Sequence, residues 1–509
     1  MAAYQPVPLP EHVDDEQDGL DDIELEKHEL KTRDSPTFDE SSPLDEDRPG
    51  PMTSSPRHGF QWRIKDLRWK LSRPNTSDLT SVLVQCLPRY LRPSSLRLTQ
   101  PLGPTAYLDA LRGYAAWNVF LAHGYKDYNF TWRDQPFLSA LMAGEAMVSL
   151  FFVISGYVLA YRLLINTRNR SSDKLLSSLA SSTFRRGIRL YGSTTVALFA
   201  ALVMVRLGWY NGGYGLYIDS IWAQLWDWCL TLLFFMNPFV DIRGFHYKQT
   251  LENKYLGVMW TIPVEFRGSM ILFIYIAGTC KLRVYARMAL TSAFIVTCYI
   301  WDAIYVAEFL MGMLVAEIAL KRNPERLGTR STLPQHTTSP RRQSLISKII
   351  WSLVLITAIF FLGEPISSTR LGFLGDWPWA ALRQVIPSWY KSTDEIYFYL
   401  GIGSFLMVLA LEMYPTLQAP LRCGWSQYVG ELSFGIYALH VPLLIAVIAQ
   451  WYNPAVRVPN GWTSAWGVLP GAIIMHFLVF ACADYFNRVD RRVVKLGRWL
   501  QERAFEKWD

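Results

Sequence analysis

The chain has 509 residues, of which 51% are apolar and 14% aromatic, and its formal net charge is +7. Apolar residues gather in blocks of about 17–22, the length needed to cross a bilayer, so the composition indicates a polytopic membrane protein and excludes an ordinary soluble enzyme. The basic residues fall between these blocks, where they report membrane orientation. We therefore expect no nucleic-acid partner.

The charge is unevenly distributed along the chain. Residues 1–50 hold sixteen acidic and four basic residues, a net charge of −12, so residues 51–509 carry +19. The acidic stretch is rich in Ser and Pro and buries too little apolar surface to fold, so we predict that it is disordered. We expect three parts: a cytosolic N-terminal region (1–100), a transmembrane domain (101–495) and a cytosolic tail (496–509).

Two features of the N-terminal region bear on targeting. No apolar stretch follows Met1, so we expect no cleaved signal peptide, and the first membrane helix would target the protein. Residues 60–71 (FQWRIKDLRWKL) are either a helix lying on the membrane surface or a basic juxtamembrane linker.

The sequence contains no motif for a metal site, a redox-active cysteine pair or a nucleotide-binding loop. The six cysteines are dispersed without a CxxC pair, and the eight histidines form no HExxH motif. There is also no GxxxxGK[ST] or GxGxxG stretch. We therefore predict no metal site and no bound cofactor.

The apolar blocks predict an all-α transmembrane bundle of about ten spans with both termini in the cytosol, because that count places every basic cluster inside. The count holds only if residues 220–238 do not fully cross. The predicted spans lie at residues 107–123, 144–164, 191–207, 259–279, 288–301, 303–320, 349–363, 396–413, 429–450 and 466–487.

The first span carries ionisable residues at regular intervals. Asp109 and Arg112 are three residues apart and share a helix face. His123 lies eleven residues beyond Arg112, roughly on the same face and about 16 Å deeper. Ionisable groups at membrane depth usually serve a function. The alternatives are an arginine that snorkels to the headgroups and a histidine that only packs.

Five stretches, in order, resemble the motifs of the membrane acyltransferase 3 family over about residues 104–495. They are LDALRGYAAWNVFLAH with its Arg112–His123 spacing, LFFVISGYVLA, FRRGIRLY, WTIPVEF and ELSFGIYALHVPLL. Members of this family O-acylate sugars, cell-envelope polymers and small natural products. The chain departs from the pattern at Pro263, which the first turn of a helix tolerates, and it carries no appended hydrolase-like domain. It looks more like the eukaryotic, especially fungal, branch that modifies small molecules.

The resemblance implies a donor site and a base. Acyl-CoA, most simply acetyl-CoA, would be the co-substrate, with Arg112 at its phosphates. Arg185, Arg186 and Arg189 would hold its nucleotide end, or would act only as topology charges. His123 would be the general base for the acceptor hydroxyl, or a transiently acylated nucleophile.

Supporting roles follow for residues in the other motifs. Asp109 would orient Arg112 or only favour the helix dipole, and Glu265 would orient His123 or shape the acceptor pocket. Ser155 would touch substrate or bond back to its own helix, and Gly156 would permit close helix packing. The remaining candidates, which line a pocket or only pack, are Trp260, Ser433, Tyr437 and His440.

The expected function is transfer of an acyl group to a hydroxyl of a small natural product such as a terpenoid or polyketide. Acetylation of a cell-wall or surface glycan is an alternative. A transporter or lipid-binding protein is another, but transporters commonly show paired repeats and none is visible. An inactive scaffold is a third, against which the intact Arg112–His123 pair argues. The host membrane is not indicated by any C-terminal signal.

Overall fold

The computed structural model describes residues 101–125, 135–212, 216–240, 251–327, 344–364, 378–390, 396–462 and 464–505, together with residues 84, 87–92, 96 and 98. All of them belong to one compact unit, Pro74–Asp509. The acidic stretch and residues 60–71 lie outside the described residues, so the expectations for them stay predictions.

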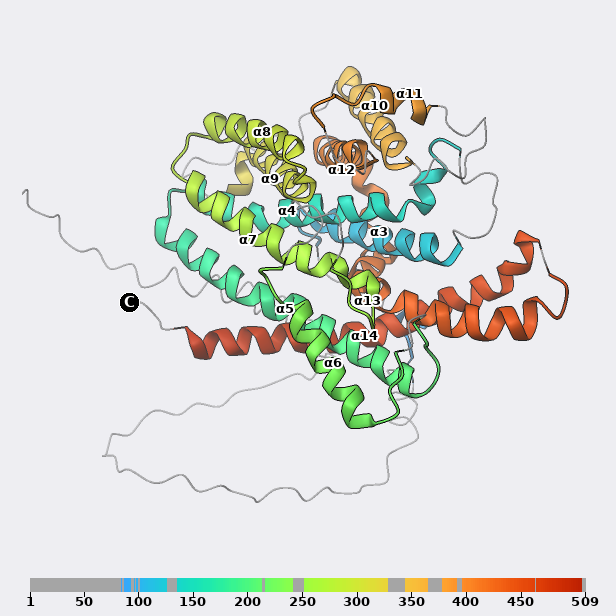
Figure 1. Cartoon of the computed structure of the whole chain (residues 1–509). Helices are drawn as coiled ribbons and strands as arrows, with labels where there is room; N and C mark the ends of the chain where they lie inside the picture. The colour runs from blue at the N-terminus through green and yellow to red at the C-terminus, as the bar shows by residue number, and fades with distance from the viewer. Residues whose placement is uncertain are drawn as a thin grey trace, which may run out of the picture. The chain divides into compact units, whose positions relative to one another are not determined.

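The described part of the chain is helical and contains no β-strand, which confirms the predicted all-α class. Twelve α-helices are joined by short 3₁₀ segments and one π-helix (Figure 1). The α-helices are α3 (Ala106–Tyr125), α4 (Gly144–Arg168), α5 (Ser172–Arg206), α6 (Ile221–Phe235), α7 (Thr261–Thr279), α8 (Val284–Ile300), α9 (Ile304–Arg322), α10 (Leu345–Leu362), α11 (Trp379–Gln384), α12 (Ile396–Met413), α13 (Gly424–Leu443) and α14 (Leu469–Ala504). The π-helix, η9 (Leu444–Arg457), continues α13 directly after Pro442, where a proline removes a backbone donor.

Six described helices, or helices continued by a neighbour, are long and apolar enough to cross a membrane. They are Gly144–Arg168, Ser172–Arg206, Gly257–Thr279, Leu345–Leu362, Gly424–Arg457 and Trp466–Ala504, and α12 with its bent continuation η8 (Pro415–Arg422) would be a seventh. This is fewer than the ten predicted, because α8 has only 17 residues and α3 and α9 carry ionisable residues. The ten-span count therefore stays a prediction.

Helix α6 lies within residues 220–238, the segment on which the ten-span count depends. Its 15 residues reach about 22 Å, less than the roughly 30 Å of a bilayer core. Ser220 caps its first turn by accepting a hydrogen bond from the Ala223 amide.

Two segments differ from the sequence-based expectation. The basic segment between the predicted spans 144–164 and 191–207 was expected to be a loop, but it continues α4 and begins the 35-residue helix α5. The prediction was wrong because basic residues favour helix as readily as loop, and here they alternate with helix formers such as Leu and Ala. Helix α14 also runs unbroken past residue 495 to Ala504.

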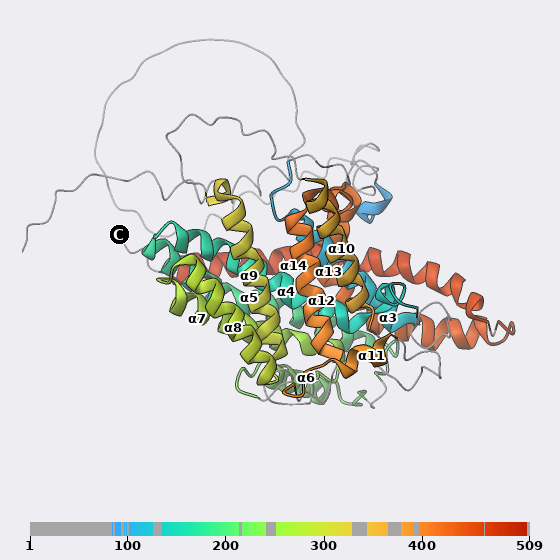
Figure 2. The same cartoon turned by 90° about the horizontal axis from the view of Figure 1, so that it is seen from above.

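Helices α3, α4, α9 and α13 form the centre of the bundle (Figure 2). α3 packs most extensively against α13, and α4 against α9. A Cβ added at Gly156 would lie 2.1 Å from the Phe309 carbonyl oxygen, and one at Gly312 would lie 2.0 Å from that of Val153. The prediction that Gly156 permits close packing is confirmed, and Gly312 is its counterpart on α9.

A second glycine contact fixes the depth of α3 against α13. A Cβ at Gly113 would lie 2.5 Å from the backbone of Gly430, and one at Gly430 would lie 2.6 Å from the Asp109 carbonyl oxygen. The two backbones touch at Asp109 and Gly113, on either side of Arg112, so the contact sets where the Arg112 side chain leaves the interface.

Candidate active site

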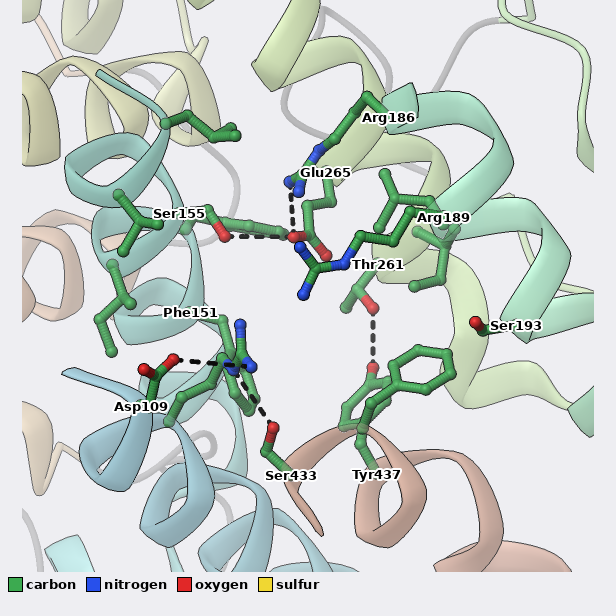
Figure 3. Close-up of a pocket in the computed structure, with 18 of the residues that line it drawn as sticks. Asp109, Phe151, Ser155, Arg186, Arg189, Ser193, Thr261, Glu265, Ser433 and Tyr437 are labelled. Carbon is green, nitrogen blue, oxygen red and sulfur yellow. Dashed lines mark hydrogen bonds and ion pairs between the residues drawn. The ribbon is translucent and has the colours of Figure 1, made fainter. Parts of the chain in front are cut away.

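A cavity of about 280 Å³ lies between α3, α4, α5, α7 and α13, with one residue from α14 at its edge (Figure 3). Polar and charged side chains enter it from every one of these helices. Eight of the predicted site residues line it: Asp109, Arg112, Ser155, Arg186, Arg189, Glu265, Ser433 and Tyr437.

Arg112 is held at the α3–α13 interface. Its Nε donates a hydrogen bond to the Ser433 hydroxyl at 3.2 Å. One of its terminal nitrogens lies 3.9 Å from the Asp109 carboxylate, a long and largely exposed pair that stabilises little. Arg112 is therefore oriented mainly by Ser433, and Asp109 makes the contact predicted for it from across one helical turn.

Glu265 ties three helices together. Its Oε1 accepts a hydrogen bond from Arg186 of α5 at 2.7 Å and one from the Ser155 hydroxyl of α4 at 3.1 Å. The Nε of Arg186 donates to the Ser269 hydroxyl at 2.9 Å, one turn further along α7. Two hydrogen bonds in different directions fix the guanidinium plane of Arg186, so Glu265 supports an arginine and makes no contact with His123.

Arg189 differs from its two neighbours. It extends into the cavity from α5, close to Glu265 and Thr261 (Figure 3). Within the described part of the chain it has no hydrogen bond or ion pair, and it keeps exposed surface. A guanidinium with a fork of N–H donors directed into a cavity suits an anionic ligand, above all phosphate or carboxylate.

The inner wall carries a tyrosine–threonine pair. The Tyr437 hydroxyl lies 2.9 Å from Thr261 Oγ1 and donates to the Val258 carbonyl at 2.5 Å. Because the Tyr437 proton is used by that carbonyl, the threonine hydroxyl is the donor between the two side chains. This arrangement joins α13 to the start of α7.

His123 and His440 lie beyond this wall, outside the lining of the cavity. Their ring centroids are 5.2 Å apart, and the His440 ring is 6.0 Å from that of Tyr437. His123 is an exposed residue in the last turn of α3, whereas His440 is fully buried. The order from the cavity is thus Tyr437, His440, His123.

The hydrogen bonds of His440 assign its tautomer. Its Nδ1 lies 2.8 Å from the Tyr437 carbonyl oxygen and 3.1 Å from that of Ile436. Carbonyl oxygens only accept, so Nδ1 carries the proton and Nε2 is the acceptor. This Nε2 is buried and has no hydrogen-bond partner among the described residues. The His123 ring is a close neighbour of the His440 ring.

Besides the two histidines, two further predicted residues do not line the cavity. Trp260 precedes α7 in η5 (Gly257–Trp260), and its ring contacts Tyr305 at 6.0 Å. Arg185 precedes Arg186 on α5 and therefore points about 100° away around the helix. Grouping the three arginines of this helix ignored that rotation.

Four further polar residues of the lining were missed: Ser193, Thr261, Glu431 and Asp490. Helical spacing could have found two of them, because Ser193 lies one turn after Arg189 and Thr261 one turn before Glu265. The Ser193 hydroxyl donates to the Asp490 carboxylate. No sequence signal links Glu431 and Asp490 to the site, because they approach it only through tertiary packing.

A metal site would need several His, Cys, Asp or Glu side chains close together. Among residues that the structure describes, no group of three or more His, Cys, Asp or Glu side chains could hold a metal ion. The expectation of a metal-free site stays a prediction.

Comparison with known proteins decides the family. Residues 105–486 match the model of the acyltransferase 3 family, described as an acyltransferase domain. The chain belongs to this family. The match covers three quarters of the chain and includes all of α3, α4, α5, α7 and α13, so the chain is a multi-pass integral membrane protein.

Fungal relatives of known name share most of this length. The O-acetyltransferase PaAT-1 of Phomopsis amygdali is 30% identical over 453 residues, which cover 81% of this chain and 88% of that protein. Acyltransferase R4 of a Phoma species is 22% identical over 73% of this chain and 87% of its own length. Acyltransferase clz18 of Cochliobolus lunatus is 20% identical over 67% and 83% respectively. No solved structure matches the chain.

Proposed function

We propose that this acyltransferase 3 protein transfers an acyl group, most simply acetyl, from acyl-CoA to a hydroxyl of a small natural product. The observation that carries the proposal is the convergence of Arg112, Arg186 and Arg189 on one cavity within a membrane helix bundle. Three guanidiniums from two helices match a polyphosphate donor. The relative named an O-acetyltransferase supports oxygen as the acceptor atom and acetyl as the group.

The three arginines have different roles in donor binding because their protein partners differ. Arg112 and Arg186 are oriented by protein partners, Ser433 and Glu265, so their donors are preorganised for phosphate oxygens. Arg189 has no such partner in the described chain, so phosphate binding costs it no existing ion pair. In acyl-CoA an extended pantetheine arm separates the phosphates from the thioester. The phosphates can therefore bind in the basic cavity near Arg112 while the thioester reacts near His123.

The chemical step is carried by His123. Its imidazole accepts the proton of the acceptor hydroxyl as the oxygen attacks the thioester carbonyl. The tetrahedral intermediate then expels the CoA thiolate, which takes the proton back from His123, so an ester forms and the thioester C–S bond breaks. His440 positions His123 and accepts a hydrogen bond from its imidazolium through Nε2. A thioester is already activated, so transfer needs no redox cofactor.

Orientation follows from the basic residues. The arginines at the cavity and at the end of α14 support a donor mouth and termini that face the cytosol, under the positive-inside tendency. Acyl-CoA is a cytosolic metabolite in this scheme and would enter from that side, while the acceptor reaches His123 from the other end of α3.

The proposal is tested with the full chain in native membranes. Labelled acetyl-CoA is supplied with a pool of natural-product alcohols and polysaccharides, and labelled product is extracted. We expect label on an alcohol with the native chain and none with His123→Ala at equal protein level. Label on polysaccharide alone would replace the acceptor class, and label transfer by neither chain, with solute flux across the membrane, would favour a transporter.

A further inference from the structure

We propose that Asp490, Ser193 and Phe434 form a subsite for the adenine base of the acyl-CoA donor, on the side of the cavity between α5, α13 and α14. All three residues line the cavity. This inference rests on the proposed function, because it assumes that acyl-CoA is the donor. It deepens that function by assigning the part of the donor that distinguishes a nucleotide thioester from a thioester on a carrier protein.

Asp490 is the one carboxylate of the cavity lining that has no ion pair in the described part of the chain. The other three each have an arginine partner: Asp109 pairs with Arg112, Glu265 with Arg186, and Glu431 with Arg89 and Arg491. Arg189 acts on Asp490 only at longer range, without an ion pair. No residue one turn before or after Asp490 on α14 is cationic. Its negative charge therefore has no cation in direct contact.

The hydrogen bonds of Asp490 leave one oxygen for a ligand. The Ser193 hydroxyl donates to Oδ1, and Oδ2 accepts no hydrogen bond within the described chain. An ionised carboxylate only accepts hydrogen bonds, and it repels a phosphate group. In a cavity that binds an anionic donor, Oδ2 therefore faces a part of that donor which carries N–H or O–H groups instead of negative charge.

Close packing of α5 against α14 fixes the position of this carboxylate. A Cβ added at Gly192 would lie 2.7 Å from Val493 Cγ1, so the two helices approach closely beside Ser193 and Asp490. The Ser193 side chain is buried. Its hydroxyl holds Oδ1 in one place, so the helix packing also sets the direction of Oδ2.

An aromatic ring lies next to the carboxylate. The Phe434 ring of α13 is 5.8 Å from that of Phe486, and Phe486 lies one turn before Asp490 on the same face of α14. Phe434 lines the cavity and is half-buried, so part of its surface is open to a ligand. A planar base that stacks on this ring would present its edge to Asp490.

Adenine is the part of acyl-CoA that fits both features. Its ring system is planar, and its exocyclic amine carries two N–H groups at the edge. The ribose and pantoate hydroxyls also donate hydrogen bonds, but neither belongs to a flat ring that stacks on Phe434. Ser193 lies four residues after Arg189, about 6 Å of helix rise. This separation suits a base that one ribose separates from a diphosphate bound at the arginines.

The test measures equilibrium binding to the full chain in nanodiscs, with acetyl-CoA and its 1,N⁶-ethenoadenine analogue as ligands. The etheno bridge keeps a planar aromatic base but removes both N–H groups. We expect the native chain to bind acetyl-CoA about tenfold more tightly, the value of one charge-assisted hydrogen bond. Asp490→Ala should lose this discrimination. Asp490→Asn, which keeps the shape and one carbonyl acceptor, should retain part of it, and this variant guards against a folding defect.

Phe434→Leu tests the stacking surface separately. It removes the ring but leaves Asp490 in place, so the dissociation constants of both ligands should rise together, by about tenfold. In transfer assays kcat should be unchanged in the Asp490 and Phe434 variants, because the base is remote from the thioester. A Phe434→Leu chain that binds both ligands as the native chain does would contradict the stacking.

Glu502→Ala is the matched control. Glu502 is an exposed carboxylate on the same helix, and it does not line the cavity. This variant should keep the native affinity and discrimination. Equal affinities of the two ligands for the native chain, or undiminished discrimination in Asp490→Ala, would overturn the subsite.

A free adenine nucleotide offers the same base, and competition separates it from the donor. Unlabelled acetyl-CoA should displace labelled acetyl-CoA at a lower concentration than ATP does, because only the donor also carries the pantetheine arm. Stronger displacement by ATP would assign the subsite to a free nucleotide and overturn the proposal. Failure of the proposed function is distinct: acetyl-CoA would then bind with the expected discrimination, but no acceptor would receive label.

Discussion

Arg186 and Glu265 form a 2.7 Å ion pair at the wall of the cavity, although they lie 79 residues apart in sequence. Ser155, on a third helix, donates a hydrogen bond to the same carboxylate oxygen. The Arg186 side chain is 11% exposed and that of Glu265 is 23% exposed. The pair joins α4, α5 and α7 at the point where the donor is expected to bind, so it links the packing of the bundle to the geometry of the site.

Glu265→Gln should weaken donor binding through Arg186. The amide keeps the shape but loses the charge that orients the guanidinium, so we expect KM for acetyl-CoA to rise by about tenfold, with a smaller loss in kcat. Steady-state kinetics with varied donor checks this. Ser155→Ala removes only one uncharged donor to the same oxygen and leaves the ion pair in place, so it should have the weaker effect. The reverse order would contradict the role given to the ion pair.

Arg189→Ala should separate binding from stability. Arg189 has no hydrogen bond or ion pair in the described chain, so its loss should leave the unfolding temperature unchanged and raise the dissociation constant of acetyl-CoA by about tenfold or more. Lys174→Ala is the control, because it removes one exposed positive charge from the same helix outside the cavity lining. Equal losses of affinity in both variants would show that only the overall charge matters.

Gly156→Ala should destabilise the bundle. The new Cβ would meet the Phe309 carbonyl at 2.1 Å, and forcing α4 and α9 apart costs about 1–3 kcal/mol or more. Thermal unfolding in detergent measures it. Gly278→Ala on α7 is matched, since a Cβ there meets nothing within 4 Å, and it should be neutral or stabilising. A Gly156→Ala protein as stable as the native one would contradict the close approach.

Glu317→Gln should be the most destabilising polar change in the described bundle. Glu317 of α9 pairs with Arg168 of α4 and Arg287 of α8, each at 2.8 Å, and the exposed fractions of the three side chains are 2%, 9% and 2%. Neutralising the shared carboxylate leaves two buried guanidiniums uncompensated, at a cost of about 3–5 kcal/mol. Unfolding in detergent measures this loss of stability. A loss smaller than that of Gly278→Ala would contradict the burial of Glu317, Arg168 and Arg287.

Much of the site was predictable from helical spacing. Ser433 and Tyr437 line the cavity from one face of α13, as their separation of four residues indicated. The same face continues to His440, one turn deeper, where it meets His123 instead of the cavity. Spacing on a single helix fixes a face but does not say where along that face the cavity ends.

The remaining contacts depend on tertiary packing. The dense basic charge between the predicted spans 144–164 and 191–207 indicated a loop, so the common face of Arg186, Arg189 and Ser193 was not recognised. The bonds of Glu431 to Arg89 and Arg491 join segments that are distant in sequence. No local pattern encodes such a meeting, because it is decided by how α13 and α14 pack.

His440→Phe should slow the chemical step and leave donor binding intact. The variant removes the Nε2 acceptor that would stabilise protonated His123, so we expect kcat to fall about 10–100-fold with KM for acetyl-CoA unchanged. His440→Gln keeps an acceptor and should restore part of kcat. A rise in KM with constant kcat in both variants would instead make His440 a packing residue.

The division between a donor cavity at Arg112 and a base at His123 is tested most directly by measuring donor binding and acetyl transfer on the same variants. Equilibrium binding of labelled acetyl-CoA without acceptor is compared with transfer at saturating acceptor. We expect His123→Ala to bind the donor as the native chain does and to transfer nothing, and Arg112→Ala to lose binding while transferring at high donor concentration. Loss of donor binding in His123→Ala, or full transfer by it, would contradict the account.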